Sequence, residues 1–567
     1  MSHARLLVRY LLPISLILLI LGGLALFFYH KRPPSAPLPV KEAVLKTPLP
    51  DDTVTLYLKN GAAISGKLIR EDRDSYTILY EGGEVVFTAA EVERMERGIM
   101  GEKKEGLIFD EALPERWPYI NDIVIKLANG IIVDSMITDA DKLRVVVKSP
   151  VDGGGSIEQE IPREKIEYLI FRPVDNPQTK NIGEGLKRLF PKMRFYEEGD
   201  ITIVTDSYIT WVREFQKTLR GVYKDIYLMD FGLVKDKKPA VQNFVVIFDD
   251  YEDYMEYAAA DGIPGWATLG YFDPAGRVLY LFNSLGDKTS DFVFKTLIGE
   301  PAKRVDEDVK TLKGYAGSKY ELYIEGLGEE VKDKLWRHYN LIKGRFHEQT
   351  VVTLRHEFTH EIFHNYNLQD VGLSQKGYGD RALLVDKKKR FLETEDPKEK
   401  KMYLMELLGL KSEERTEELL ASNSWLAEGT AAYFEMDPPG SISERWLFTF
   451  QKMRKGNGVY PLEQLTVYKM GSFPGVYTEA MLNAYAESWA FVTFLMDRYP
   501  EQFIEYQKRI SNEAAKGQDD INWLLAALGK DLKGLEKEFL EYMDRYEELE
   551  DPFIRDFEKF YNIFKES

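Results

Sequence analysis

The sequence predicts a multidomain protein with an N-terminal transmembrane helix, two small β modules and a final α+β domain whose C-terminal half is mainly helical. Three observations support this division. An uncharged run of nineteen residues lies near the N-terminus, a block of alternating polar and apolar residues occurs twice, and helical periodicity dominates after residue 345. A chain of 567 residues also exceeds the size at which one hydrophobic core stops growing.

Composition narrows the class of protein. A hydrophobic fraction of 44% with 13% aromatic residues is typical of a folded chain. The net charge of −18 repels phosphate backbones, so we expect no nucleic-acid partner. Because cysteine is absent, disulfides, thiol catalysis and thiolate metal sites are excluded, and any metal site would use His and carboxylate ligands.

The run from Leu11 to Tyr29 is long enough to cross the hydrocarbon core of a bilayer. It lacks the small-residue ending of a cleaved signal peptide, so residues 1–32 are expected to form a single-pass anchor. Six prolines in residues 33–50 predict a stiff, extended linker. Flanking positive charges are nearly balanced, but the short N-terminal tail and the large acidic body favour a cell-membrane protein with an extracytoplasmic body.

The segments Thr53–Gly61 and Asp122–Gly130 follow one pattern. Each alternates polar and apolar residues and ends in an Asn-Gly turn. Each continues in further short strands, so residues 51–98 and 119–173 are expected to form two small SH3-like β modules. These modules would either bind a protein partner or act as spacers, and both interpretations stay open.

From about residue 195 the pattern changes to mixed α and β structure. Two charged stretches, 284–345 and 368–420, are interpreted as insertions, and the run Lys387–Arg390 as a solvent-exposed face. The chain is expected to end in a helical tail at 549–567. The expected elements are strands at 201–205 and 243–248, a helix at 208–224 and a hairpin formed by 268–272 and 277–282.

The pattern His356-Glu357-Phe358-Thr359-His360 lies in a segment predicted to be helical from Gln349 to Asn367. Two histidines four residues apart share one helix face, so both imidazoles can bind one zinc ion, with Glu357 beside it as a possible general base. Histidine is scarce, with 7 in 567 residues, and random placement would give this pattern only about 0.014 times. We therefore predict a site for a single Zn²⁺ ion.

His364 is a third histidine on the same helix face. It lies eight residues from His356, or roughly 12 Å along the helix axis. Zinc–nitrogen bonds of about 2 Å cannot span that distance. His364 is therefore expected to orient a ligand or simply to pack near the site.

A second segment, beginning at Trp425, predicts a helix that ends before Pro438. Glu428 and Glu435 lie seven residues apart on one face of this helix, with alanines between them. Glu428 supplies a carboxylate for the third ligand position. Glu435 would either accept a proton from a ligating histidine and so orient it, or lie at the surface.

Together these motifs resemble the gluzincin, or peptidase MA-like, zinc metallopeptidases. In that family HExxH precedes WLxEGxAxYxE on the next helix, here Trp425–Glu435, and a third helix carries a Yxx-Ser-Trp segment, here Tyr485–Trp489. The resemblance covers residues 195–548 and implies a zincin-like fold for that domain. It also implies that Glu428 binds the metal and that Tyr485 donates a hydrogen bond to the oxyanion, although a core tyrosine is the alternative.

The resemblance implies hydrolysis of peptides or proteins by zinc-activated water, with Glu357 as the general base. The GxMEN signature of related aminopeptidases is absent, so an endopeptidase is expected. The strand Arg277–Phe282 is expected to form the cleft edge that pairs with an extended peptide.

The alternative is a catalytically inactive, zincin-fold binding or scaffolding protein of the cell envelope. The intact set His356, Glu357, His360 and Glu428 argues against it, since an inactive relative usually loses a ligand. An intramembrane protease is excluded because HExxH lies far from the apolar run.

Overall fold

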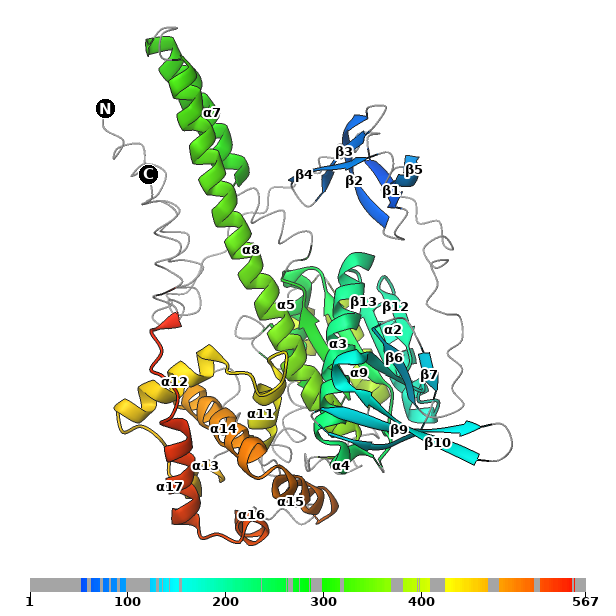
Figure 1. Ribbon diagram of the computed structural model, residues 1–567. Helices are drawn as coiled ribbons and strands as arrows, with labels where there is room; N and C mark the ends of the chain where they lie inside the picture. Colours follow the sequence, from blue (N-terminus) through cyan, green and yellow to red (C-terminus); the bar gives the residue numbers. More distant parts are fainter. Residues whose placement is uncertain are drawn as a thin grey trace. The chain divides into compact units, whose positions relative to one another are not determined.

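The structure is a computed structural model (Figure 1). The predicted anchor at 1–32 and linker at 33–50 lie outside the residues that it describes, as does most of the predicted tail at 549–567. Among the described residues, no helix combines the length and apolar character needed to cross a bilayer. The described residues are 53–58, 63–71, 75–80, 83–88, 92–97, 123–128, 132–134, 136–141, 143–151, 155–235, 237–261, 263, 269–274, 276–284, 286, 298–316, 321–368, 381–394, 396, 398–407, 424–467, 479–513, 521–552 and 555.

The chain divides into two compact units. One contains residues 1–117 and 290–339, and the other contains residues 118–289 and 340–567. The second unit holds the second β module, a mixed sheet and most of the helices, and every residue of the candidate site belongs to it.

The two β modules share one strand order. The first forms a five-stranded antiparallel sheet in the order β4-β3-β2-β1-β5. The second consists of two three-stranded sheets, β10-β9-β8 and β11-β6-β7. If β7 and β8 are taken as one interrupted strand, the order β10-β9-β8/β7-β6-β11 corresponds to that of the first module. The strands are β1 (Thr53–Leu58), β2 (Ala63–Glu71), β3 (Ser75–Tyr80), β4 (Gly83–Thr88), β5 (Val92–Arg97), β6 (Ile123–Leu127), β7 (Ile132–Asp134), β8 (Met136–Ala140), β9 (Arg144–Val151), β10 (Gly155–Pro162) and β11 (Ile166–Phe171).

Irregularities in the pairing also occur at matching positions. Ile69 in β2 and Thr138 in β8 are each skipped in the register with the next strand. Glu93 in β5 and Glu167 in β11 are each skipped opposite the first strand of their module. A bulge inserts one residue into a strand and bends it locally. Shared strand order and shared bulges are what a duplication produces, whereas the SH3-like assignment stays a prediction.

The second module does not stand apart from the domain that follows it. Its buried residues Val145, Val147 and Leu169 belong to the same hydrophobic cluster as Val222 of helix α3 (Ile209–Met229). The Phe171 ring stacks on the Tyr223 ring of α3, with centroids 4.2 Å apart. The module therefore shares its core with the domain that carries the candidate site.

A five-stranded mixed sheet forms the centre of this unit, in the order β12-β13-β14-β16-β15. The three central strands are parallel, and the two edge strands run antiparallel to them. Strands β13 and β14 coincide with the predicted strands at 201–205 and 243–248. The bounds are β12 (Arg194–Glu198), β13 (Ile201–Thr205), β14 (Asn243–Phe248), β15 (Gly270–Asp273) and β16 (Val278–Phe282).

Both faces of the sheet are covered. Alternate residues point to opposite faces of a strand, so Ile203 and Val245 join one hydrophobic cluster while Val204 and Val246 join another. The first cluster includes residues of α3 and of the helix α8 (Glu321–Asn365). The second includes residues of α2 (Pro177–Leu189) and α5 (Tyr251–Ala260) on the other face.

Helix α8 spans Glu321–Asn365, so the prediction that this helix begins at Gln349 is wrong. The earlier residues read as a charged insertion because charges surround the helix, but ion pairs one turn apart, such as Lys334–Glu330 and Arg337–Asp333, support a helix there. Within the first unit, α8 packs beside α7 (Glu300–Ala316), where Lys332 pairs with Asp306 (Figure 1). The described part of the stretch 284–345 is thus largely a helical hairpin.

The interpretation of Lys387–Arg390 as a solvent-exposed face is wrong for Lys388. This residue of α9 (Arg381–Glu393) is buried, and its Nζ lies 2.5 Å from Asp261 Oδ1 and 3.0 Å from the hydroxyl of Tyr257. One turn of helix places only some of four consecutive residues toward solvent. Lys388 therefore links α9 to the C-terminal end of the helix Tyr251–Ala260.

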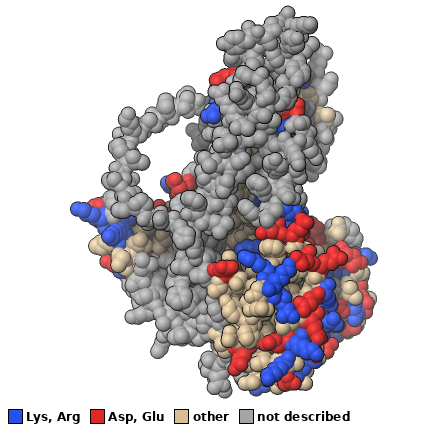
Figure 2. Space-filling model, turned by 90° about the vertical axis from the view of Figure 1, so that its left-hand side faces the viewer, with Lys and Arg blue, Asp and Glu red and all other residues tan. Residues whose placement is uncertain are grey.

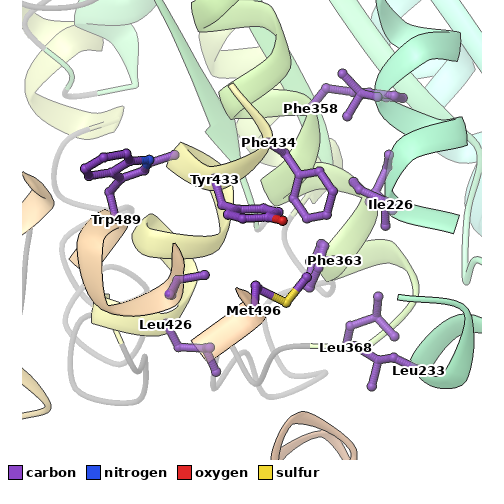
Figure 3. Close-up of a cluster of buried hydrophobic side chains, with 14 of the residues drawn as sticks. Ile226, Leu233, Phe358, Phe363, Leu368, Leu426, Tyr433, Phe434, Trp489 and Met496 are labelled. Carbon is purple, nitrogen blue, oxygen red and sulfur yellow. The ribbon is translucent and has the colours of Figure 1, made fainter. Parts of the chain in front are cut away.

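The C-terminal half is helical in every regular element that the structure describes, as predicted. In Figure 3 aromatic side chains Phe358 and Phe363 of α8 lie near Tyr433 and Phe434 of α11, and this buried cluster joins the helices behind the candidate site. The helices are α11 (Ser424–Phe434), α12 (Glu444–Lys455), α13 (Leu462–Leu465), α14 (Glu479–Arg498), α15 (Pro500–Glu513), α16 (Ile521–Leu528) and α17 (Leu532–Met543).

Acidic and basic side chains are interspersed over the described part of the face in Figure 2. Exposed ion pairs also occur, such as Arg454–Asp544 and Arg545–Asp497. Pairs of this kind contribute little to stability, about 0–1 kcal/mol each.

Candidate metal centre

Three side chains from two helices converge at one point. His356 Nε2 lies 3.2 Å from His360 Nε2, and Glu428 Oε2 lies 3.2 Å from the first nitrogen and 3.3 Å from the second. The histidines come from α8 and the glutamate from α11. Among the residues that the structure describes, no other group of three or more histidines or carboxylates converges in this way.

The dimensions of this triangle match a zinc site. Four ligands at about 2.0–2.1 Å from a tetrahedral ion lie about 3.3 Å from one another. The three donor atoms therefore fit one face of such a tetrahedron. The side chains of His356, His360 and Glu428 are 11%, 16% and 21% exposed, so the centre is largely buried. Three ligands would leave the fourth vertex of the tetrahedron for water or a substrate group.

Glu435 and Trp446 hold the His356 ring in place. Glu435 Oε1 lies 2.8 Å from His356 Nδ1, and the indole Nε1 of Trp446 donates to Glu435 Oε2 across 2.8 Å. With its proton on Nδ1, a neutral His356 ring would offer its Nε2 lone pair to a metal ion. Of the two interpretations of Glu435, the buried contact with histidine is the one observed.

The pKa values at this centre respond to the close pairing. Burial acts to lower the pKa of His356, but the hydrogen bonds that its ring donates to the carboxylates of Glu428 and Glu435 outweigh burial, so the pKa lies well above its ordinary value. Burial acts to raise the pKa of Glu428, but the two histidines outweigh it and hold the pKa well below its usual range. The carboxylate of Glu428 is therefore ionised, as a metal ligand must be.

Glu357 contacts the edge of the sheet. Its Oε2 accepts a hydrogen bond of 3.0 Å from the backbone N–H of Phe272 in β15. Burial raises the pKa of Glu357, while His356 and His360 partly oppose this shift. The candidate base is thus oriented by the main chain of a neighbouring strand.

The expectation that Arg277–Phe282 forms the cleft edge is wrong. Strand β16 pairs with β14 on one side and β15 on the other, so it is internal. The edge strand is β15, the first arm of the same hairpin. Sequence pattern located the hairpin, but the two arms alternate similarly and only the pairing with β14 distinguishes them.

Gly429 allows the helix that carries Glu428 to pack closely. A Cβ atom at this position would lie 2.5 Å from the carbonyl oxygen of Ser488 and 2.7 Å from Val492 Cγ2. Both neighbours belong to α14. Glycine therefore lets α11 rest directly on α14, which fixes the backbone next to Glu428.

Tyr485 lies beside the centre. Its ring centroid is 6.3 Å from that of His356 and 6.0 Å from that of Trp446. The ring planes of Tyr485 and Trp446 are 17° apart. The side chain is partly exposed, which distinguishes it from a fully buried core tyrosine. The structure thus brings Tyr485 next to the histidine pair.

His364 does not join the converging group. Its buried ring packs against Phe272, with centroids 5.4 Å apart. Burial, together with the positive charge of Arg277, lowers the pKa of His364 to about 3, so this ring is neutral. Of the two interpretations of this histidine, packing agrees with these contacts.

Sequence analysis missed three residues that shape the centre. Trp446 and Phe272 act through contacts that no local pattern encodes. Arg355 is different, because a charged residue immediately before His356 in a helix with two buried sides is a visible signal. Its guanidinium is buried and binds the backbone carbonyls of Phe434, the last residue of α11, and of Met436, two residues further on.

No model of a protein family, no curated protein and no solved structure matches this chain significantly.

Proposed function

We propose that this chain is a zinc-dependent peptidase of the gluzincin type, an endopeptidase anchored to the cell membrane by its N-terminal helix with its body outside the cytoplasm. The observation that carries the catalytic part is the triangle of donor atoms, with sides of 3.2, 3.2 and 3.3 Å. These separations match those between ligands of one tetrahedral zinc ion, about 3.3 Å.

His356, His360 and Glu428 would hold the zinc ion. A bound zinc ion supplies an acidic water and polarises a carbonyl group. Glu357 would take a proton from the attacking water and later transfer it to the leaving amine. The N–H of Phe272 keeps one carboxylate oxygen of Glu357 fixed, so the other oxygen is left to accept the proton.

Tyr485 is the proposed oxyanion donor. Stacking on Trp446 restricts its ring, so little conformational entropy is lost when its hydroxyl forms a hydrogen bond. Loss of one such donor typically reduces turnover about 10²–10³-fold. The same stack links Tyr485 to Glu435 through Trp446, so the proposed donor and the His356 ring share one support.

The test uses the full-length protein purified in detergent. Zinc content is measured by elemental analysis, and cleavage is measured on a mixed peptide library with and without a chelator. We expect near-stoichiometric zinc and chelator-sensitive internal cleavage that Glu357→Gln abolishes. Zinc-free protein without cleavage would instead support the scaffolding alternative.

A further inference from the structure

The residue before His356 is an arginine, Arg355, which binds the main chain on both sides of Glu435. Arg355 Nε donates to the carbonyl oxygen of Phe434 across 2.8 Å, and its Nη2 donates to that of Met436 across 2.8 Å. Glu435, which accepts from His356 Nδ1, lies between these two residues. Two successive residues of α8 therefore bind one short segment. Arg355 binds the main chain of residues 434 and 436, and His356 binds the side chain of Glu435.

Asp225 of α3 fixes the guanidinium of Arg355 and also binds the second β module. Its Oδ2 accepts from Arg355 Nη2 across 2.9 Å, and its Oδ1 accepts from Arg163 Nη2 across 2.7 Å. Arg163 begins the short 3₁₀ helix η1 (Arg163–Lys165) between β10 and β11. The side chains of Arg355 and Asp225 are each 3% exposed and that of Arg163 is 17% exposed, so water screens these contacts little.

We propose that Arg163, Asp225 and Arg355 are positioning residues that couple the second β module to the metal centre. The module is then a structural part of the centre, and the spacer interpretation does not apply to it. This inference rests on the proposed zinc function of His356, His360 and Glu428. It adds that zinc affinity depends on Arg163, which belongs to the second β module.

The charges of these residues complement one another. Two arginines share one aspartate, and the remaining positive charge faces the carbonyls at the C-terminal end of α11, where the helix dipole is negative. Charge-assisted hydrogen bonds of a planar guanidinium have strict directions. Ligand geometry in a metal site must hold to within about 0.5 Å, so a loosened Arg355 would weaken the site through Glu435 and His356.

The test is Arg163→Met in the full-length protein. The zinc dissociation constant is measured by competition with a chromophoric chelator, and ligand geometry by the visible spectrum of the Co²⁺-substituted protein. We expect the dissociation constant to rise, by less than the about 10–100-fold that loss of a direct partner of a metal ligand costs, and the Co²⁺ spectrum to change. Arg163→Lys, which keeps the charge, should recover part of the affinity.

The matched control is Arg144→Met. Arg144 belongs to the same module, but it pairs with the exposed Glu160, so its loss should leave both measurements unchanged. Wild-type affinity and spectrum in a folded Arg163→Met variant would overturn the proposal. If that variant does not fold, the same measurements are made on Arg163→Lys. Unchanged zinc affinity in Arg163→Lys also contradicts a role specific to the centre. Failure of both variants to fold contradicts it as well. A wild-type chain that binds no zinc would refute the proposed function instead.

Discussion

The backbone N–H of Phe272 donates to Glu357 Oε2 across 3.0 Å and joins the HExxH helix to the edge strand β15. A main-chain donor cannot be removed by changing the Phe272 side chain. An extended peptide that added to this edge would compete with Glu357 for the same N–H, so binding of a peptide strand and orientation of the base are linked.

Glu357→Gln should remove the base and leave the rest of the centre intact. Glutamine retains a carbonyl oxygen that can accept from Phe272, so zinc content and thermal unfolding should match the wild type. Turnover should fall by about 10²–10⁴-fold, the usual contribution of a general base. Peptide cleavage and elemental analysis on the same preparation check this. Undiminished turnover would remove Glu357 from the mechanism.

Glu435→Gln should weaken zinc binding without removing a ligand. The amide cannot stabilise the His356 ring as a carboxylate does, and loss of such a partner typically costs about 10–100-fold in metal affinity. Trp446→Phe, which removes only the donor to Glu435, should have a smaller effect in the same direction. Chelator competition gives both dissociation constants. Glu463→Gln, at an exposed position, is the control and should bind zinc normally.

The sequence predicted those parts of the centre that depend on local geometry. His356 and His360 share a face because any helix brings residues four apart together. Glu428 was predicted by resemblance to a family motif, and the structure brings it to the two histidines. Trp446 and Phe272 could not be predicted, because their contacts depend on how separate elements pack.

The same limit applies to the fold. Strand β14 was predicted because buried parallel strands are nearly continuous apolar runs, and β13 was predicted because short runs of Ile, Val and Thr are typical of strands. The burial of Lys388 was not predicted, since its partner Tyr257 is 131 positions away and a run of basic residues normally faces water. The start of α8 was missed because a charged helix lacks the apolar stripe that marks amphipathic ones.

Lys388→Met should destabilise the domain strongly. Asp261 would keep the hydroxyl of Tyr271 but lose its cation, and breaking one side of a buried ion pair typically costs about 3–5 kcal/mol. Urea unfolding measures the change. The neighbouring Lys389→Met, at a mostly exposed pair with Glu393, should cost under about 1 kcal/mol. If Asp261→Asn in the Lys388→Met background restores no stability, the loss does not come from an unpaired charge.

Buried carboxyl groups should make the domain less stable as the pH rises. Burial raises the pKa of Asp230 to about 7 and, against opposing hydrogen bonds, that of Asp200 to about 7. The native state therefore keeps protons that the unfolded chain loses above about pH 4, and each group lowers the unfolding free energy by about 1.4 kcal/mol per pH unit up to about pH 7.

Asp230→Asn should reduce this pH dependence. The variant should match the wild type near pH 4 and be more stable near pH 8, because an amide has no proton to lose. Urea midpoints across this pH range provide the measurement. Asp175→Asn, at a side chain 77% exposed, should leave the profile unchanged. Equal stability of wild type and Asp230→Asn at pH 8 would contradict a buried ionisable group there.

The matched bulges of the two β modules allow their sequences to be compared position by position. Counted from the glutamate bulges Glu93 and Glu167, the position that corresponds to Arg163 is Ala89, which has no side chain able to reach a distant carboxylate. A chimaera carrying the first copy in both places would therefore keep the strand order and still lose the arginine. Under the proposed coupling, the two modules could not replace one another.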